Sequence, residues 1–183
     1  MPQLQVKGFK IDPTDCVLRE ARRLGAVREE AVPWLAEEIA RWYRHGNVGQ
    51  RIRATGHLLE PEELRALGLR GNVKISREVI STLTGKGLKD PMHLFDLTCT
   101  AIVRCLLHEA QQLELQKLAQ HRIKIIVGVE YRTGPQPPCR YARALAGQRF
   151  RLGEQPPQPL PECDADVCGC GYRYLTKPRF EGG

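Results

Sequence analysis

The sequence predicts an α+β protein with a mainly helical N-terminal domain, residues 1–120, and a small C-terminal module, residues 121–183. Three observations carry this prediction. Apolar residues recur at helical spacing through the first two-thirds of the chain. The pattern then changes to an alternation around β-branched residues, which is typical of a strand. After that strand come two proline-rich segments and four cysteines.

The first two predicted helices are defined by their caps. In DPTDCVLREARRLG, Asp12 is the expected N-cap, Pro13 takes the first helical position, and Gly25 follows the last turn. The second helix covers residues 28–46. We expect Pro33 in its first turn, because proline deeper in a helix removes a backbone hydrogen bond.

Three further helices complete the N-terminal domain. Short ones are predicted at residues 60–68 and 76–85, the latter beginning at Ser76. The longest covers residues 90–119, and its broad apolar stripe predicts the central helix of the core. The stripe consists of Phe95, Cys99, Ile102, Leu106 and Leu113. The last third, QQLELQKLAQ, is polar and is expected to project out of the core.

The C-terminal module begins with the predicted strand. HRIKIIVGVEYRTG indicates a strand over residues 122–131, which Gly134 and Pro135 end. PQPPC and EQPPQPLPEC are stiff connectors. Between them, RYARALAGQRF predicts a short helix followed by an extended segment.

The composition is that of a globular protein, with 42% hydrophobic and 27% charged residues. The chain has no apolar run of the roughly 18 residues that a membrane span requires. The segment MPQLQVKGFKIDP lacks the charged start and apolar core of a secretory signal. These features predict a cytoplasmic protein without a membrane partner. In a reducing cytosol, clustered thiols are more often metal ligands than disulfides.

Four cysteines near the C-terminus have the spacing of a metal site. Zn²⁺ in structural sites takes four thiolate or imidazole ligands in a tetrahedron, and four cysteines leave no position for water. Gly169 and Gly171 allow the tight turns that such a loop needs. The module has few large apolar residues, so a metal would supply folding energy. The predicted ligands of a structural Zn²⁺ are Cys139, Cys163, Cys168 and Cys170.

Other interpretations of the cysteines stay open. An iron–sulfur cluster uses the same ligands, and the four thiols could also be free. A disulfide framework would leave one of seven cysteines unpaired, and a bridge from Cys168 to Cys170 would be strained. The other three cysteines lie on apolar helix faces and are predicted to be buried thiols: Cys16, Cys99 and Cys105.

Residues 138–175 resemble a small four-cysteine domain of bacterial proteins of unknown function. The resemblance implies that the four cysteines form one unit, and it implies no activity. The sequence departs from that domain after Tyr174, where LTKPRFEGG replaces a charged run. The matching positions are Cys139, Ala144, Leu145, Gly147, Arg149, Phe150, Pro157, Pro159, Leu160, Cys163, Cys168, Cys170 and Tyr172.

Two basic stretches are candidate nucleic-acid contacts. RWYRHGNVGQRIR places arginines beside two aromatic rings, and cations hold phosphates while an aromatic face stacks on a base. CRYARALAGQRFR places others next to the cysteines. The alternative is that the aromatic residues are core and the arginines are a solvated face. The predicted phosphate contacts are Arg41, Arg44, Arg51, Arg143 and Arg149.

The chain carries 28 Lys and Arg residues against 21 Asp and Glu, a net charge of +7. With the cysteine site, this charge favours a non-enzymatic, zinc-stabilised protein that binds nucleic acid or serves in a nucleoprotein complex. A protein-interaction or scaffold subunit is the first alternative, favoured by the proline-rich connectors and the long helix. A nuclease-type effector is the second. His108-Glu109 begins a zinc-peptidase pattern, but Gln112 stands where the second histidine is required.

Overall fold

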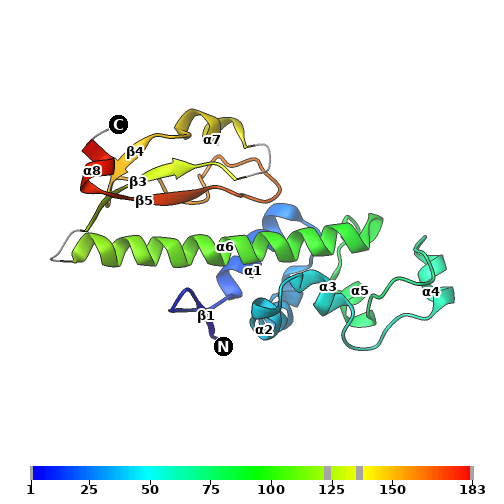
Figure 1. Ribbon diagram of the computed structural model, residues 1–183. Coiled ribbons are helices and arrows are strands. Elements are labelled where there is room, and N and C mark those ends of the chain that lie inside the picture. The colour runs from blue at the N-terminus through cyan, green and yellow to red at the C-terminus, as the bar shows by residue number, and fades with distance from the viewer. Residues whose placement is uncertain (1, 122–124, 135–137, 182–183) are drawn as a thin grey trace. The chain divides into compact units, whose positions relative to one another are not determined.

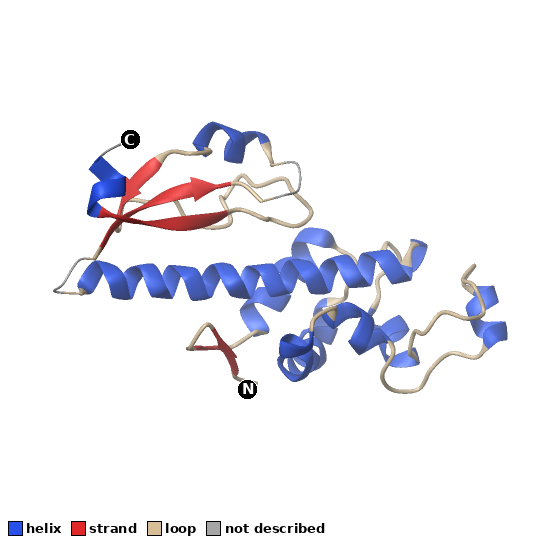
Figure 2. Cartoon of the chain, viewed as in Figure 1, coloured by secondary structure: helices blue, strands red, loops and turns tan. Residues whose placement is uncertain are grey.

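The computed structural model describes residues 2–121, 125–134 and 138–181 (Figure 1). Its helices and two small antiparallel sheets confirm the predicted α+β class (Figure 2). By its internal contacts the chain divides into two units. The N-terminal unit comprises Met1–Leu4 and Asp12–Val103, and the C-terminal unit comprises Gln5–Ile11 and Arg104–Gly183. This division by contacts does not test whether the two predicted domains, with their boundary near residue 121, fold independently. That boundary stays a prediction.

The N-terminal unit consists of short helices and the first part of one long helix. Its elements are α1 (Thr14–Leu24), η1 (Glu29–Ala31), α2 (Val32–Trp42), η2 (Tyr43–His45), α3 (Val48–Arg53), α4 (Pro61–Ala66), α5 (Arg77–Thr82), η3 (Gly87–Lys89) and the beginning of α6 (Pro91–Gln120).

The start of α1 differs from the prediction by one position. Pro13 is the N-cap residue, with helical backbone angles, so the prediction of Asp12 as N-cap is wrong. Asp12 still serves the helix end, because its carboxylate accepts hydrogen bonds from the Thr14 amide at 2.9 Å and from the Thr14 hydroxyl at 2.6 Å. Gly25 ends α1 with a left-handed φ of 66°, as predicted.

The helix predicted over residues 28–46 is interrupted. Pro33 lies in the first turn of α2, as predicted, but the α-helix ends at Trp42. Gly46 and Asn47 have φ angles of 61° and 45°, which redirect the chain into α3. The sequence did not predict α3, because only two large apolar residues mark its buried face.

Ser76 begins α5 as predicted, and its hydroxyl accepts a hydrogen bond from the Val79 amide. This helix ends at Thr82 rather than near Gly85, because Leu83 pairs with Val27 in an antiparallel bridge. The long helix α6 is confirmed. Its predicted stripe is fully buried except at Leu113, which is 37% exposed.

The C-terminal unit contains a three-stranded antiparallel sheet of order β4-β3-β5. The strands are β3 (Ile126–Arg132), β4 (Arg149–Arg151) and β5 (Gly171–Thr176), and the helices between and after them are α7 (Arg140–Leu145) and α8 (Lys177–Glu181). The predicted strand is confirmed from Ile126 onward, and its first residues, 122–124, lie outside the described residues. The sequence did not predict β5.

A hairpin of β1 (Leu4–Val6) and β2 (Phe9–Ile11) also contributes to this unit. Its turn residues, Lys7 and Gly8, have φ angles of 48° and 86°, and positive φ at both positions is the pattern of a tight two-residue hairpin.

The second part of α6 packs on β5, so the expectation that this polar segment projects out of the core is wrong (Figure 1). The Gln111 amide group donates to the Tyr172 carbonyl at 3.1 Å and accepts from the Tyr172 amide at 3.3 Å. The Tyr174 hydroxyl donates to the Glu114 carboxylate. Gln111 thus supplies hydrogen-bond partners to backbone groups of β5, and Glu114 supplies one to a tyrosine of the same strand. Because these polar groups are paired with one another, a polar helix face can be buried there.

Candidate functional site

The four predicted metal ligands lie together at one end of the sheet in the C-terminal unit. Cys139 is the N-cap residue of α7. The other three cysteines lie in the loop that leads into β5, where Cys168 and Cys170 flank Gly169 directly before the strand and Cys163 lies further upstream. All four are free thiols. They line a single cavity of about 10 Å³, and a sphere the size of one water molecule needs roughly 10–15 Å³. The cavity therefore has the size of a single-atom site.

Backbone amides lie beside the four sulfur atoms. The Ala142 amide donates to Cys139 at 3.4 Å. Three more amides act on the pKa values of the other thiols in the lowering direction: Ala165 on Cys163, Cys170 on Cys168, and Gly134 on Cys170. Hydrogen bonds to the charged form of a group stabilise that form. The amides beside Cys163, Cys168 and Cys170 thus act in favour of the thiolate, which is the form that binds a metal.

The sulfurs also form a chain of neighbours. Cys163 interacts with both Cys139 and Cys168, and Cys168 interacts with Cys170. The Cys168 thiol donates to Cys170 and thereby lowers the pKa of Cys170 to about 6, while the same contact raises the pKa of Cys168. Burial raises the pKa of Cys163. Cys170 is thus the first of these three groups to ionise.

Two glycines permit this arrangement. A Cβ atom on Gly134 would lie 2.5 Å from the carbonyl oxygen and 2.8 Å from the Cα atom of Gly169. The backbone at the end of β3 therefore runs directly against the turn between Cys168 and Cys170. This close approach brings the Gly134 amide to the Cys170 sulfur. Gly169 has no positive φ angle, so the turn itself does not require glycine there as predicted. The close contact at Gly134 is a requirement that the sequence did not reveal.

The sulfur–sulfur distances are longer than a tetrahedral zinc site requires. Among the described residues, no three of the four sulfurs lie within 4.8 Å of one another. Zinc–sulfur bonds of about 2.3 Å in a tetrahedron place the sulfurs roughly 3.8 Å apart. A shared metal ion would therefore have to draw the sulfurs of these cysteines closer together.

The other three cysteines are buried as predicted, with at most 2% exposure. Cys99 is a free thiol. Cys16 and Cys105 are disulfide-bonded, so the prediction of free thiols is wrong for these two. Because the chain contains oxidised cysteine, the argument from a reducing compartment does not support the metal site, which rests instead on the geometry of its own four residues.

The three arginines predicted in the N-terminal unit are exposed, but two have partners. Arg41 pairs with Glu38 at 2.6 Å, and the Trp42 indole donates to the same carboxylate at 3.1 Å. The Arg51 guanidinium lies 5.9 Å from the centroid of the Trp42 ring. A base that stacked on this ring would have to displace Arg51. The third exposed arginine is Arg44.

The two arginines predicted in the C-terminal unit are also exposed, at Arg143 and Arg149. Each donates one hydrogen bond to a backbone carbonyl: Arg143 to Pro138 at 3.1 Å, and Arg149 to Phe180 at 3.3 Å. A guanidinium carries five N–H donors. Both side chains are therefore oriented by the protein and still have donors for a phosphate.

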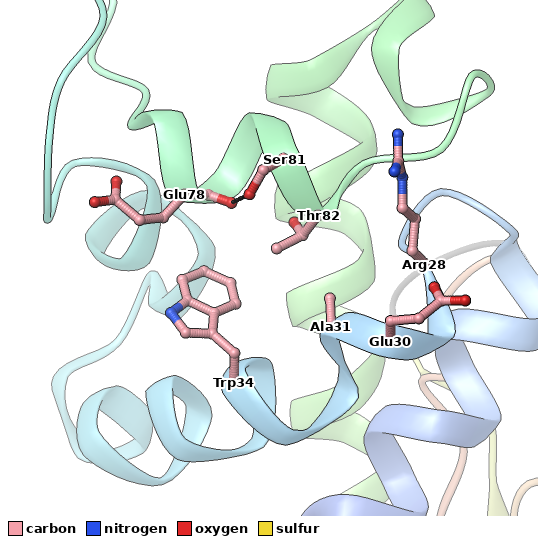
Figure 3. Close-up of a pocket in the computed structure, with 7 residues that line it drawn as sticks. All are labelled: Arg28, Glu30, Ala31, Trp34, Glu78, Ser81 and Thr82. Carbon is pink, nitrogen blue, oxygen red and sulfur yellow. Dashed lines mark hydrogen bonds between the residues drawn. The ribbon is translucent and has the colours of Figure 1, made fainter.

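A cavity of about 560 Å³ in the N-terminal unit was not predicted (Figure 3). The Trp34 indole projects from α2 toward Glu78, Ser81 and Thr82 of α5. The Glu78 carboxylate is already occupied, because it accepts hydrogen bonds from the His57 ring at 2.5 Å and from its amide at 3.1 Å. The sequence contained one indication of this cavity, because Trp34 lies outside the apolar stripe of its helix.

Comparison of the chain with protein-family models, with curated proteins and with solved structures found no match. The resemblance of residues 138–175 to a bacterial four-cysteine domain therefore stays an expectation. No helix in the described part of the chain has the length and apolar character that crossing a membrane demands.

Proposed function

We propose that the C-terminal module holds one structural Zn²⁺ through four cysteines, and that the protein binds nucleic acid without enzymatic activity. The observation that carries the metal proposal is that four free thiols surround one small cavity. The proposed ligands are Cys139, Cys163, Cys168 and Cys170.

The size and donor set of the site favour zinc over the alternatives. A cavity of about 10 Å³ suits a single ion, whereas an iron–sulfur cluster contains several iron and sulfide atoms. Four thiolates are the ligands of structural zinc and leave no position for a catalytic water. The small core of this unit supports a stabilising role. The buried cluster around the sheet contains eight residues in the part of the chain that the structure describes, and two of them are the proposed ligands Cys139 and Cys170.

Charge and exposure support nucleic acid as the partner. The net charge is +7, and Arg143 and Arg149 are exposed, oriented and only partly hydrogen-bonded. Arg143 lies on α7, the helix that Cys139 caps. Metal binding would therefore fix the helix that presents this arginine.

A salt titration with labelled single-stranded DNA and RNA tests the partner. We expect affinity to fall steeply between ~50 and 200 mM salt, because bound phosphates release counterions. Arg143→Gln and Arg149→Gln should weaken binding to every sequence and lower the salt slope by about one each. Arg65→Gln is the matched control, since Arg65 is exposed and forms an ion pair with Glu62 on its own helix α4.

The other functions predict different results in this experiment. An absence of binding at low salt would contradict the nucleic-acid proposal and favour a scaffold role. Cleavage of the labelled strand in the presence of magnesium would contradict the absence of enzymatic activity and favour a nuclease.

A further inference from the structure

A second cavity of the C-terminal unit is strongly basic. Its volume is about 290 Å³, close to the lower end of the roughly 300–1,000 Å³ range of small-ligand pockets. None of the described residues that line it is acidic. The cationic side chains in its lining are Lys7, Arg104, Arg132 and Arg173.

Two of these four cations share one carboxylate. Arg132 and Arg173 both pair with Glu130, at 2.7 and 2.6 Å. The Glu130 side chain is only 8% exposed and does not line the cavity. Lys7 and Arg104 are exposed, and no ion pair is seen for either of them in the part of the chain that the structure describes. The cavity thus has an excess of positive charge.

The cavity has a fixed floor. The His108 ring donates from Nε2 to the Cys170 carbonyl at 3.0 Å. Gln111 forms its two hydrogen bonds with the backbone of Tyr172. Both His108 and Gln111 are buried and line the cavity. The floor therefore joins α6 to the start of β5 and does not depend on flexible surface side chains.

The cations reach this floor from four separate elements. Lys7 lies in the turn of the β1–β2 hairpin, where positive φ angles fix the backbone. Arg104 lies on α6, Arg132 ends β3, and Arg173 lies on β5. Donors that converge from several directions suit a tetrahedral oxyanion, and guanidinium groups bind phosphate oxygens in pairs.

We infer that this cavity binds the phosphate group of a small phosphorylated ligand. The inference goes beyond the zinc and nucleic-acid proposals, because Lys7 and Arg104 belong to neither. The same chemistry occurs in free phosphomonoesters and in the backbone of a nucleic acid strand, and the size of the cavity favours the former.

Isothermal titration of the full chain at low salt tests the inference, with inorganic phosphate, adenosine monophosphate and a thymidine oligonucleotide as separate probes. We expect inorganic phosphate and the monophosphate to bind. Lys7→Gln and Arg104→Gln should each weaken both about tenfold, the typical effect of removing one charged hydrogen-bond donor. Lys10→Gln is the matched control, since Lys10 is exposed on the same hairpin and does not line the cavity. It should leave the affinity unchanged.

Three outcomes would overturn the inference: no binding of inorganic phosphate or monophosphate, binding of the oligonucleotide alone, or equal weakening by Lys10→Gln. Arg143→Gln separates this inference from the proposed function, because it should weaken nucleic-acid binding and leave the affinity for inorganic phosphate unchanged. Circular dichroism of each variant verifies that it is folded.

Discussion

Replacement of Gly134 by alanine tests the backbone contact that supports the cysteine site. The added Cβ atom would lie 2.5 Å from the Gly169 carbonyl oxygen and 2.8 Å from its Cα atom. Ordinary contacts begin near 3.4 Å, so the two backbone segments would have to separate by about 0.9 Å. Because the neighbouring atoms are backbone, no side chain can rotate away to relieve the contact.

The expected cost follows from overpacking a closed site. Insertions of this kind destabilise a protein by about 1–3 kcal/mol, and we take about 2 kcal/mol. For a chain of this length, each kcal/mol corresponds to roughly 2–4 °C in Tm, so Tm should fall by about 4–8 °C. Zinc affinity should fall as well, because the shift moves the Gly134 amide away from the Cys170 sulfur.

Thermal unfolding by circular dichroism and competition with a chromogenic chelator measure the two effects. Gly85→Ala is the matched control. The same methyl group there would meet nothing within 4 Å, so Tm should stay within about 1 °C. A Gly134→Ala protein with unchanged Tm and unchanged zinc affinity would refute the argument that this close approach builds the site.

Three further predictions concern single side chains. Tyr131→Phe keeps the buried ring and removes only the hydroxyl beside the Cys170 sulfur, so chelator competition should show zinc affinity about tenfold weaker; an unchanged affinity would contradict this. Gln111→Ala removes the two hydrogen bonds between Gln111 of α6 and the Tyr172 backbone of β5, and urea unfolding should show a loss of about 2–3 kcal/mol, whereas a loss below about 0.5 kcal/mol would mean that water replaces the amide. Hydrogen bonding from His57 lowers the pKa of Glu78 from 4.5 to about 2. The ionised carboxylate therefore adds stability that is complete above pH 4.5 and is lost as the pH falls toward 2. The stability difference between the parent and Glu78→Gln should shrink over that range, and a constant difference would contradict the assignment.

The helices were predictable because their signals are local. Ser76, Pro33 and Gly25 each mark a helix end within a few residues, and the structure confirms all three. Errors occurred where a distant partner decides the outcome. The helix at Ser76 ends early because Leu83 pairs with Val27, and no local pattern records that pairing.

The sequence indicated which cysteines lie together, but it did not indicate the backbone contacts that bring them together. Spacing and composition suggested the four residues, and the structure brings them to one cavity. The amide from Gly134 and its contact with Gly169 depend on two segments 35 positions apart in the sequence, so only the fold reveals them. Strand β5 was missed for the same reason, since its partners are β3 and the polar face of α6.

The metal content of the purified protein tests the central claim most directly. Elemental mass spectrometry on protein prepared under reducing conditions should find one zinc per chain. A Cys168→Ser, Cys170→Ser variant should lose that zinc together with the folded structure of the C-terminal unit, as followed by hydrogen exchange of its strands. Absence of metal from the parent protein, or iron in place of zinc, would contradict the account.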